Sequence, residues 1–548
     1  MTSRVLLPAW RIMRWWRRRP TALFAVVSTV WCLILLRQYA LVQNLATKEG
    51  PPSSSSSFQQ KHQHSAVKRA PLLSNSIKHK KPIVSEKPNE KRPELKAPSM
   101  KRSIPAGDGT FNNIPIIYRK GAPSSAVHCV GDDGRPDAVS WMFRSCQFQQ
   151  LCMNVETKEY LLVRDSKHPE WLPSQTDQQQ NLTDYTVALG GINPRWEVGE
   201  GSAGDAHKVK WFPKIVDASE VLPSGYYELP TSSLLIPFHS FAAHNVGHLL
   251  WDDFYPIFNL MQLFGFVPGE SQLTLIRQQL DPKQKLYASC DRPRKRKLCH
   301  TNFAKFLPLM GVDPITFSTS NGIRVAGALE SPLVCAPTAA AGLGMLTDHG
   351  FRDHGWVEHN GTALEWVPHN LGRGPAFHQF RQFMVQNLLR NQQPPALLVP
   401  PRVGISIFSS RDHDRRQNFT QQIDYLQKYL PASDAHVESL TLWELSMEEQ
   451  IQAAAQSQIF ISTCGGGSMT ATFLPRGASL IVFYNATGGF DFEPFELNGR
   501  AARLDWDLLN HVSHLRVHWL PITTMDSNED LELLLRLVQH ELTAMKSL

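Results

Sequence analysis

The chain lacks the sequence fingerprints of the common nucleotide-dependent enzymes. It has three consecutive glycines, Gly465, Gly466 and Gly467, but no Walker lysine follows them and no G-x-G-x-x-G pattern occurs. These absences argue against an NTPase and against a dehydrogenase. No convincing Asp-x-Asp motif that could hold a metal–diphosphate is present either. The nearest match is Asp491-Phe492-Glu493, which is not persuasive. There is no internal repeat.

Excess positive charge is missing from most of the chain, although the whole sequence carries a formal charge of +7. Residues 1–102 contain 20 Lys+Arg and four Glu, whereas the remaining 446 residues contain 36 basic and 45 acidic residues. The part expected to fold is therefore mildly acidic. We expect no nucleic-acid partner, because a basic surface is the electrostatic requirement for one.

Long apolar runs are scarce, and the most prominent one is Thr21–Leu36, sixteen residues near the N-terminus. Extended by Tyr39–Val42, it is long enough for a short transmembrane helix over 21–42. Six arginines precede it and one follows it, which predicts a cytoplasmic tail at 1–20 and a luminal body. No convincing small-residue cleavage site follows the run, so an uncleaved signal-anchor is favoured over a signal peptide.

Apolar residues are also few between the expected anchor and the expected folded body. Residues 43–107 are rich in Ser, Lys, Pro, Gln and His and include PPSSSSS at 51–57. Too little apolar surface is available there to form a core, which predicts a disordered stem.

The cysteines and glycosylation sequons both fit a luminal body. Seven of the eight cysteines lie outside the apolar run, an odd number that predicts three bridges and one free thiol. Cys290–Cys299 is a plausible small loop, and Cys464, beside the glycines, is the expected odd one. Four sequons are present, at Asn181, Asn360, Asn418 and Asn485.

Alternating strand-like and helix-like patterns predict an α/β protein with parallel sheets wrapped by helices. We place an N-terminal domain at 108–395 and a C-terminal domain at 396–548, separated by the prolines around 394–401. The expected elements are listed here: strands at Ser232–Pro237, Val403–Phe408, Ile459–Ile461 and Leu480–Tyr484; helices at Thr420–Tyr429, Ser446–Ala455 and Leu531–Met545; and an exposed charged loop at Asp291–Lys297.

Three histidines and two aspartates crowd into 239–253, and they are the first candidates for chemistry. On a helix, His244 and His248 share a face, and Asp252 lies one turn beyond His248. A histidine beside a carboxylate makes an oriented general base. The alternatives are a buried structural His–Asp pair with Asn245 as a helix N-cap, or a metal site, for which a single cluster is weak support.

An arginine-rich segment follows the predicted strand that begins at Val403. Ser410 and Arg411 come first, with Arg415 and Arg416 behind them. Ligands of parallel sheets bind at the carboxyl ends of strands, and the guanidinium fork suits a diphosphate. The alternative is a solvated turn in which the interleaved aspartates cancel the charge.

The glycine segment is predicted to join two parallel strands. Gly465 to Gly467, followed by Ser468, lie between a buried strand and a short helix, where backbone N–H groups can approach a phosphate. The alternative is a tight turn of the kind found in any α/β sheet.

In this order, the three segments resemble glycosyltransferase family 61. That family includes plant β-1,2-xylosyltransferase of N-glycans, EGF-domain O-GlcNAc transferase and protein O-mannose β-1,4-N-acetylglucosaminyltransferase. The resemblance rests on Asn245-x-x-His248-x-x-x-Asp252-Asp253-x-x-Pro256, on Ser410-Arg411 after a strand, and on the glycine loop with Phe473-Leu474-Pro475-x-Gly477. It covers roughly 230–490.

The resemblance implies two Rossmann-like domains facing a cleft, the GT-B arrangement, and an inverting glycosyltransferase without a cofactor or metal. A UDP-sugar would lie on the C-terminal domain against Arg411, Arg415 or Arg416 and the glycine loop. A glycan or glycoprotein acceptor would be deprotonated by Asp252 or Asp253, or by His248 held by one of them, with an aspartate favoured.

One residue departs from the family pattern. The family usually has His-Gly-Ala-Gly at the glycine loop, whereas this chain has Cys464 in the place of the histidine. A catalytically silent, membrane-anchored glycan- or nucleotide-sugar-binding protein is therefore the alternative function. Either protein is expected in the membrane of the Golgi or the endoplasmic reticulum, with its folded body in the lumen.

Overall fold

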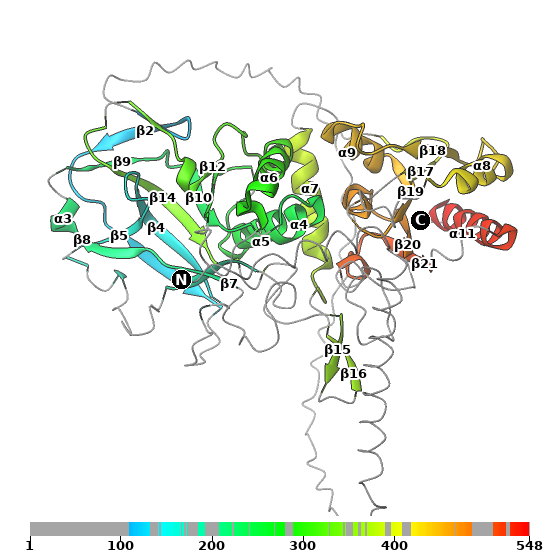
Figure 1. The fold of residues 1–548 in the computed structure, drawn as a ribbon, viewed down its shortest axis with the longest axis horizontal. Helices are drawn as coiled ribbons and strands as arrows, with labels where there is room; N and C mark the ends of the chain where they lie inside the picture. The colour runs from blue at the N-terminus through cyan, green and yellow to red at the C-terminus, as the bar shows by residue number, and fades with distance from the viewer. Residues whose placement is uncertain are drawn as a thin grey trace, which may run out of the picture. The chain divides into compact units, whose positions relative to one another are not determined.

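The computed structural model describes most of the chain beyond residue 108, and all described residues lie in one compact unit, Ser99–Leu548 (Figure 1). The described residues are 109–131, 141, 144–165, 167–168, 171–172, 185–191, 208–221, 224–240, 242–267, 269–279, 289–327, 329–343, 346, 355–359, 363–367, 370–389, 396–407, 418–465, 467–484, 508–521 and 527–546. The predicted anchor and stem lie outside them. Within the described ranges, no helix is long and apolar enough to cross a membrane.

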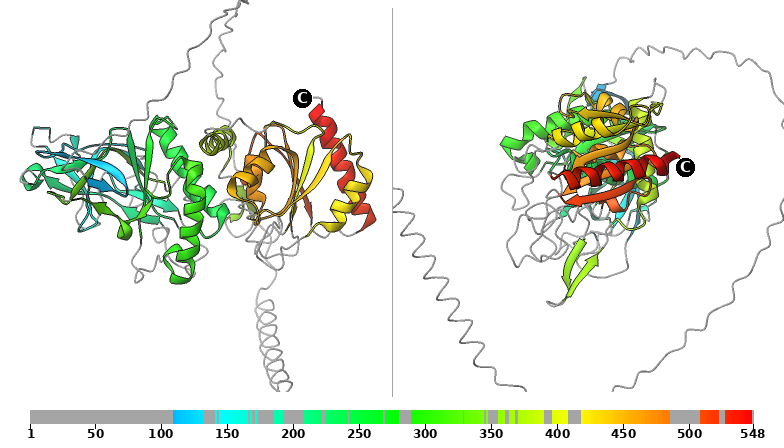
Figure 2. Two further views of the ribbon diagram at one scale, coloured as in Figure 1. Left: turned by 90° about the horizontal axis from the view of Figure 1, so that it is seen from above. Right: turned by 90° about the vertical axis from the view of Figure 1, so that its right-hand side faces the viewer.

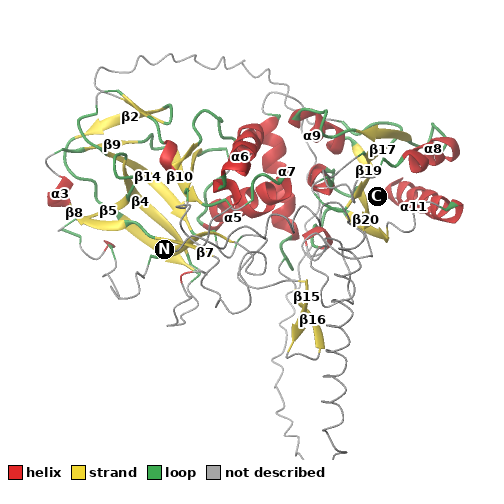
Figure 3. Cartoon of the chain, viewed as in Figure 1, coloured by secondary structure: helices red, strands yellow, loops and turns green. Residues whose placement is uncertain are grey.

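The first sheet has twelve strands, and its main path runs β12-β11-β10-β14-β9-β2-β1-β13. Figure 3 draws its strands in yellow and labels β2, β9, β14 and β10 among them. Its strands are β1 (Gly109–Phe111), β2 (Ile114–Arg119), β3 (Ala126–Val130), β4 (Ser145–Asn154), β5 (Tyr160–Arg164), β8 (Lys214–Asp217), β9 (Tyr226–Glu228), β10 (Ser233–Phe238), β11 (Gln272–Arg277), β12 (Ser318–Thr319), β13 (Val325–Ala326) and β14 (Leu333–Ala341). Two further antiparallel strand pairs form two-stranded sheets of their own, β6 (Val187–Gly191) with β7 (Lys208–Trp211) and β15 (Gly355–His359) with β16 (Ala363–Val367).

Only part of the first sheet is parallel, unlike the fully parallel sheet that the sequence patterns predict. Strands β12, β11, β10, β14 and β9 run parallel, but β4 pairs antiparallel with β14, and β1, β2 and β3 are also in antiparallel pairs. For β1 and β2 the reason is local turn chemistry. Asn112 and Asn113, both at positive φ, form the two-residue loop between Phe111 and Ile114, and such loops join antiparallel strands.

A long helical segment carries the His–Asp cluster out of the buried strand β10. It consists of α4 (Val246–His248), a π-helical stretch η5 (Leu249–Phe254) and α5 (Tyr255–Leu263). The helix begins after His244, so His244 and His248 do not share a helical face as the sequence predicted. The other helices of this part are α3 (Ala218–Val221), η6 (Ser289–Asp291), α6 (Pro293–Phe306), η7 (Leu307–Met310), η8 (Ser320–Gly322) and α7 (Gly374–Leu388).

The second sheet is the doubly covered parallel sheet that the sequence predicts. Its order is β18-β17-β19-β20-β21 and every neighbouring pair is parallel. The strands are β17 (Arg402–Ser406), β18 (His436–Leu440), β19 (Ser457–Thr463), β20 (Ser479–Tyr484) and β21 (Arg516–Pro521), and the helices are α8 (Thr420–Tyr429), α9 (Met447–Ala455), η10 (Ser468–Phe473) and α11 (Asn528–Lys546).

Alternate residues of the central strands enter two different cores. Ile459 and Ile461 of β19 pack with α8 and α11, which lie together on one side of the sheet (Figure 2). Phe460, between them, belongs to a larger core that also contains residues of α5, α7 and α9. Burial on both faces is typical of a parallel sheet and explains the continuous apolar runs in its strands.

Three disulfides link the described cysteines, and all of them lie in the first part of the chain. Cys129–Cys146 joins β3 to β4, Cys152–Cys335 joins β4 to β14, and Cys290–Cys299 closes the small loop considered in the sequence. Cys464 is free and buried.

Candidate functional site

His248 and Asp252 form the central pair of the candidate site. His248 Nδ1 lies 2.6 Å from Asp252 Oδ2, and the two residues are one helical turn apart. The histidine side chain is 27% exposed and the aspartate 9%, so the imidazole is the more accessible partner. Asn245 caps the helix, and its side chain accepts a hydrogen bond from the Gly247 backbone N–H. The pair therefore has an oriented imidazole with its second nitrogen directed away from the carboxylate.

Asp253 is placed differently from its neighbour. It is 2% exposed, and the Ser240 hydroxyl donates a 2.6 Å hydrogen bond to its Oδ2. Burial raises the pKa of Asp253 well above its usual range, with the charge of Asp252 adding to the rise, while Ser240 and Arg277 oppose it. A carboxyl group this enclosed suits a structural role better than contact with a substrate.

The other two histidines of the cluster have different surroundings from the His248–Asp252 pair, although the charge of His248 acts on His244. His239 Nδ1 lies 3.1 Å from the Gln278 carbonyl oxygen, and burial, with the charge of Arg277, lowers the pKa of His239 to about 4. Burial, with the charge of Lys295, lowers the pKa of His244 to about 4 as well. Both imidazoles are therefore neutral at neutral pH.

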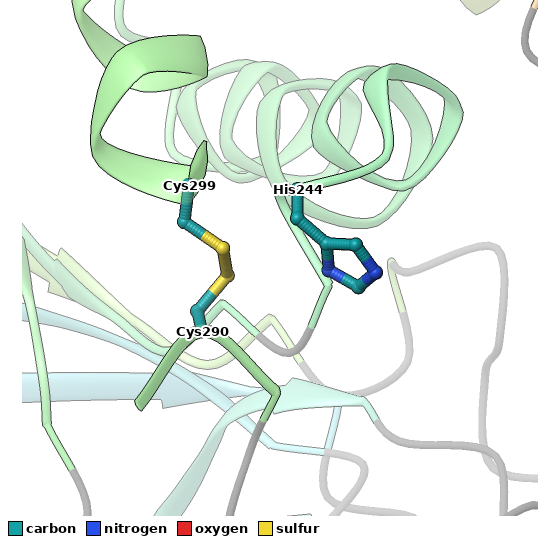
Figure 4. Close-up of side chains that lie close together, drawn as sticks. All are labelled: His244, Cys290 and Cys299. Carbon is teal, nitrogen blue, oxygen red and sulfur yellow. A yellow bond between two sulfur atoms is a disulfide. The ribbon is translucent and has the colours of Figure 1, made fainter. Parts of the chain in front are cut away.

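His244 also lies beside two cysteines, and the three side chains together look like a metal-ligand set. Its ring nitrogen and the sulfurs of Cys290 and Cys299 lie within 4.8 Å of one another. The two sulfurs are bonded to each other, however, as Figure 4 shows. A disulfide has no thiolate that could bind a cation. This group is therefore a structural disulfide with a histidine beside it.

The glycine loop has the predicted position between two parallel strands. It follows β19, and Gly465 has φ +118°, a conformation that glycine adopts without strain. The helix after it, η10, is a 3₁₀ helix whose residues are all buried. The Ser468 N–H and hydroxyl both donate to the Gly465 carbonyl oxygen, at 3.0 and 2.7 Å. Ser468 therefore closes the loop on itself, and Gly466 lies outside the described residues.

The helix that follows the glycine loop is in direct contact with the His–Asp helix. A Cβ on Gly247 would lie 3.3 Å from Met469 Cγ, which shows how closely the two segments approach. Trp251 Nε1 donates toward Met469 Sδ at 2.7 Å. At the other end of η10, Arg381 of α7 donates from Nε and Nη2 to the Phe473 carbonyl oxygen, at 3.2 and 3.1 Å.

The structure thus brings together two of the three predicted segments, the one with the His–Asp cluster and the one with the glycine loop. It also adds Ser240, Trp251, Met469 and Arg381, which the sequence analysis did not single out as site residues. No sequence pattern marks these contacts, because the partners are separated by 13 to 218 residues.

Several predicted site residues lie outside the described residues. They are Ser410, Arg411, Arg415, Arg416 and the sequon residues Asn181, Asn360 and Asn485. Asn418 is described and exposed, and its side-chain oxygen accepts a hydrogen bond from the Thr420 N–H.

Comparison with protein-family models gives one result that bears on the site. The model of glycosyltransferase family 61 matches residues 355–481. This confirms the family resemblance inferred from the sequence. The matched segment includes β17, the described part of the glycine loop and η10, while the His–Asp helix precedes it.

Comparison with solved structures finds distant similarity. The E. coli heptosyltransferase WaaC with ADP is 11% identical, and the match covers 56% of this chain and 99% of that one with a TM-score of 0.24. The iron-containing dodecameric glycosyltransferase TibC from enterotoxigenic E. coli is 12% identical, and its match covers 72% of this chain and 97% of that one, also with a TM-score of 0.24. No curated protein matches the chain closely enough to count as a relative.

Proposed function

We propose that this chain, a glycosyltransferase by the family 61 match of its residues 355–481, transfers a sugar from a UDP-sugar to a glycan or glycoprotein with inversion. The observation that carries the proposal is the contact between the two halves of the site. An oriented His248–Asp252 pair lies on a helix that touches Met469, two residues beyond the end of the glycine loop. Such an arrangement supports an acceptor base opposite a nucleotide-sugar site.

The geometry favours His248 as the base, with Asp252 holding the ring. The acceptor hydroxyl oxygen would attack the anomeric carbon while the bond from that carbon to the diphosphate oxygen breaks. The hydroxyl proton would go to His248 Nε2, and UDP would leave with the bonding electrons. Asp252 would orient the imidazole and stabilise its charged form, while the enclosed Asp253 would support the helix through Ser240.

The donor site of the proposal lies at the carboxyl ends of β17 and β19. Arg411, with Arg415 or Arg416, would neutralise the diphosphate, and the backbone N–H groups of Gly465–Gly467 would approach it. The arginines would supply the positive charge that a metal ion supplies elsewhere, so we propose that the reaction needs no metal. Xylose and N-acetylglucosamine are the donor sugars that we would test first.

The proposed location follows from the N-terminal sequence. We propose a cytoplasmic tail at 1–20, a signal-anchor at 21–42 and a stem at 43–107 that holds the folded body in the lumen of the Golgi or the endoplasmic reticulum. The three disulfides among the described cysteines suit an oxidising compartment of this kind.

A second candidate function is supported by Cys464. This residue stands where the family usually has histidine, and it is 2% exposed. If donor turnover needs that imidazole, the chain would be a membrane-anchored protein that binds a glycan or a nucleotide-sugar without transferring it.

The experiment that tests the proposal measures UDP release by a secreted form of residues 106–548. The protein would be offered a panel of UDP-sugars and mixed glycan acceptors, with and without EDTA. We expect release from one donor, undiminished by EDTA, and none from the matched Arg411→Ala variant. Retained activity in that variant would remove Arg411 from the donor site. A folded protein that binds UDP but releases none from any donor would favour the second function.

A further inference from the structure

A small cavity lies on the edge of the second sheet that is opposite to the glycine loop. It has a volume of about 260 Å³ and is lined by Arg381, Gln382, Val385, Gln386, Leu397, Ala455 and Pro475. The last three residues shortly precede β17, β19 and β20, so the cavity is at the amino ends of these strands. The glycine loop follows β19 at the carboxyl ends. The cavity is therefore separate from the proposed donor site.

Arg381 gives this cavity a positive charge without a matching carboxylate. Its only hydrogen-bond acceptor within the described ranges is the Phe473 carbonyl oxygen, and none of the ion pairs found there includes it. Burial alone lowers the pKa of its guanidinium, with no acidic neighbour to oppose the shift. A partly buried guanidinium fork with unused donors is a site for an oxyanion, because it can pair with two oxygens at once.

Two histidines lie near Arg381, outside the cavity lining, and both are uncharged at neutral pH. The rings of His378 and His514 lie 5.1 Å apart. Burial is the main cause that lowers the pKa of each histidine, and neighbouring charges that include Arg381 add to the effect. The pKa of His514 falls to about 3. Arg476 acts on His378 in the same direction. His514 is 6% exposed, and neither of its ring nitrogens has a hydrogen bond of good geometry within the described residues, although the Thr472 backbone lies close. The positive charge near the cavity therefore comes from Arg381, with exposed Arg476 nearby, and not from the histidines.

The rest of the lining suits a sugar ring. Val385, Leu397, Ala455 and Pro475 offer apolar surface for C–H groups. The amides of Gln382 and Gln386, on exposed positions of α7, can donate to and accept from hydroxyl groups. The volume lies just below the range of about 300–1000 Å³ that is usual for drug-sized ligands, which fits one sugar residue better than a nucleotide.

We propose that this cavity binds an anionic monosaccharide unit, a sugar carrying a carboxylate, sulfate or phosphate whose oxygens pair with Arg381. The site does not depend on the proposed transferase activity. It would hold a charged sugar of a longer glycan, or a free charged sugar, on the opposite sheet edge from the glycine loop.

The test is isothermal titration calorimetry of the full-length protein in detergent with four ligands. These are glucuronic acid, N-acetylglucosamine 6-sulfate, mannose 6-phosphate and neutral N-acetylglucosamine. We expect at least one charged sugar to bind and the neutral sugar not to bind under the same conditions. The pattern among the three charged ligands identifies the oxyanion.

Two variants assign the binding to the cavity. Arg381→Gln should weaken it by about tenfold or more, the loss expected for hydrogen bonds to a charged group. Gln386→Trp should block the cavity from its rim while leaving the guanidinium in place. Arg536→Gln, an exposed change of the same charge on α11, is the control and should bind as the parent does. Circular dichroism checks that each variant is folded.

The proposal would be overturned by the failure of every charged sugar to bind, by equal binding of the neutral sugar, or by unchanged binding in folded Gln386→Trp. Competition by UDP would also overturn it, because it would place the anion in the donor site. A lack of UDP release in the separate activity assay would not affect these outcomes.

Discussion

The two sheets of this protein are stabilised in different ways, although both contribute residues to the candidate site. The first sheet is mixed, has short hairpins and contains two cross-strand disulfides, Cys129–Cys146 and Cys152–Cys335. The second is wholly parallel and contains no disulfide among its described residues. Its last helix, α11, is instead tied to β20 and β21 by the buried carboxylate of Glu541.

The two sheets also supply different elements of the candidate site. The covalently linked part supplies the His248–Asp252 pair, whereas the part held by packing and one buried ion-pair network supplies the glycine loop. The two parts meet at η10, which contacts Trp251 at one end and Arg381 at the other. Substitutions in the His248–Asp252 pair should therefore change catalysis. Substitutions in the disulfides or in the Glu541 network should mainly change the free energy of unfolding.

The largest expected effect is the loss of catalysis on replacing the proposed base. His248→Ala should lower sugar transfer by about 10²- to 10⁴-fold, the usual contribution of a general base, without weakening UDP binding. Asp253→Asn is the matched control and should keep most of its activity, since its side chain is enclosed and bound to Ser240. UDP release and UDP binding, measured on the same preparations, check this. Full turnover by His248→Ala would show that His248 is not the base and would leave Asp252 as the candidate.

The next effect concerns the long-range disulfide of the first sheet. Replacing Cys152 and Cys335 together by serine should lower the free energy of unfolding by about 5 kcal/mol, because the bridge closes a loop across a sequence separation of 183. The bridge Cys129–Cys146, with a separation of 17, should contribute about 3 kcal/mol by the same relation. Denaturant unfolding of the two double variants checks the order, and equal losses would contradict the loop-closure account.

A comparable experiment on the second sheet removes its buried charge. Glu541 accepts from Arg516 Nε at 2.6 Å and lies 3.1 Å from His518 Nε2, with its own side chain 2% exposed. Glu541→Ala should cost about 1.5–3 kcal/mol, because it removes the hydrogen bonds that Arg516 and Ser479 donate to a charged group. Glu532→Ala, on an exposed face of the same helix, is the control. If both variants unfold alike, the network does not stabilise this sheet.

A smaller effect should depend on pH. Because the pKa of Asp253 is raised in the folded protein, the folded state binds the extra proton above the unfolded pKa of about 3.8. The contribution of Asp253 to stability should therefore fall as the pH rises through and above 4. Asp253→Asn should remove this decline, so that it is relatively more stable than the parent at pH 7 than at pH 4. Thermal unfolding across that range checks the sign, and parallel curves would contradict it.

The smallest effect should come from the contact between the parts. Trp251→Phe keeps an aromatic ring against Tyr255 and Phe377 but removes the Nε1 hydrogen toward Met469. We expect a loss of about 1 kcal/mol of stability. Transfer should fall more than UDP binding, because the helix of His248 is then less firmly placed. An equal fall in both quantities would mean that the contact serves stability alone.

Local sequence signals predicted the second sheet better than the first. Helix α8 has the predicted bounds, Thr420–Tyr429, and α9 starts after Ser446, whose capping box with Glu449 is a purely local arrangement. The expected charged loop at Asp291–Lys297 was wrong in part, since α6 begins at Pro293. Proline suits the first turn of a helix, and charged residues form an exposed face there.

The candidate site was predictable only where it depends on spacing within one helix. The separation of four residues between His248 and Asp252 places them together on any helix. The π-helical turn at Leu249–Phe254, which buries Asp253, follows from tertiary packing that no local pattern reports. The same holds for Arg381, whose partner Phe473 is 92 residues away.

The Cys152–Cys335 bridge has a consequence for the synthesis of the chain. Cys152 leaves the ribosome 183 residues before its partner, which at about 5–20 residues per second is a delay of about 10–40 s. During that interval Cys129 and Cys146 are already present as competing thiols, and Cys290 and Cys299 emerge before Cys335 as well. Correct pairing therefore depends on protection or reshuffling of Cys152 until β14 arrives. A pulse-labelled chain trapped with an alkylating reagent should pass through a stage in which Cys129–Cys146 has formed and Cys152–Cys335 has not.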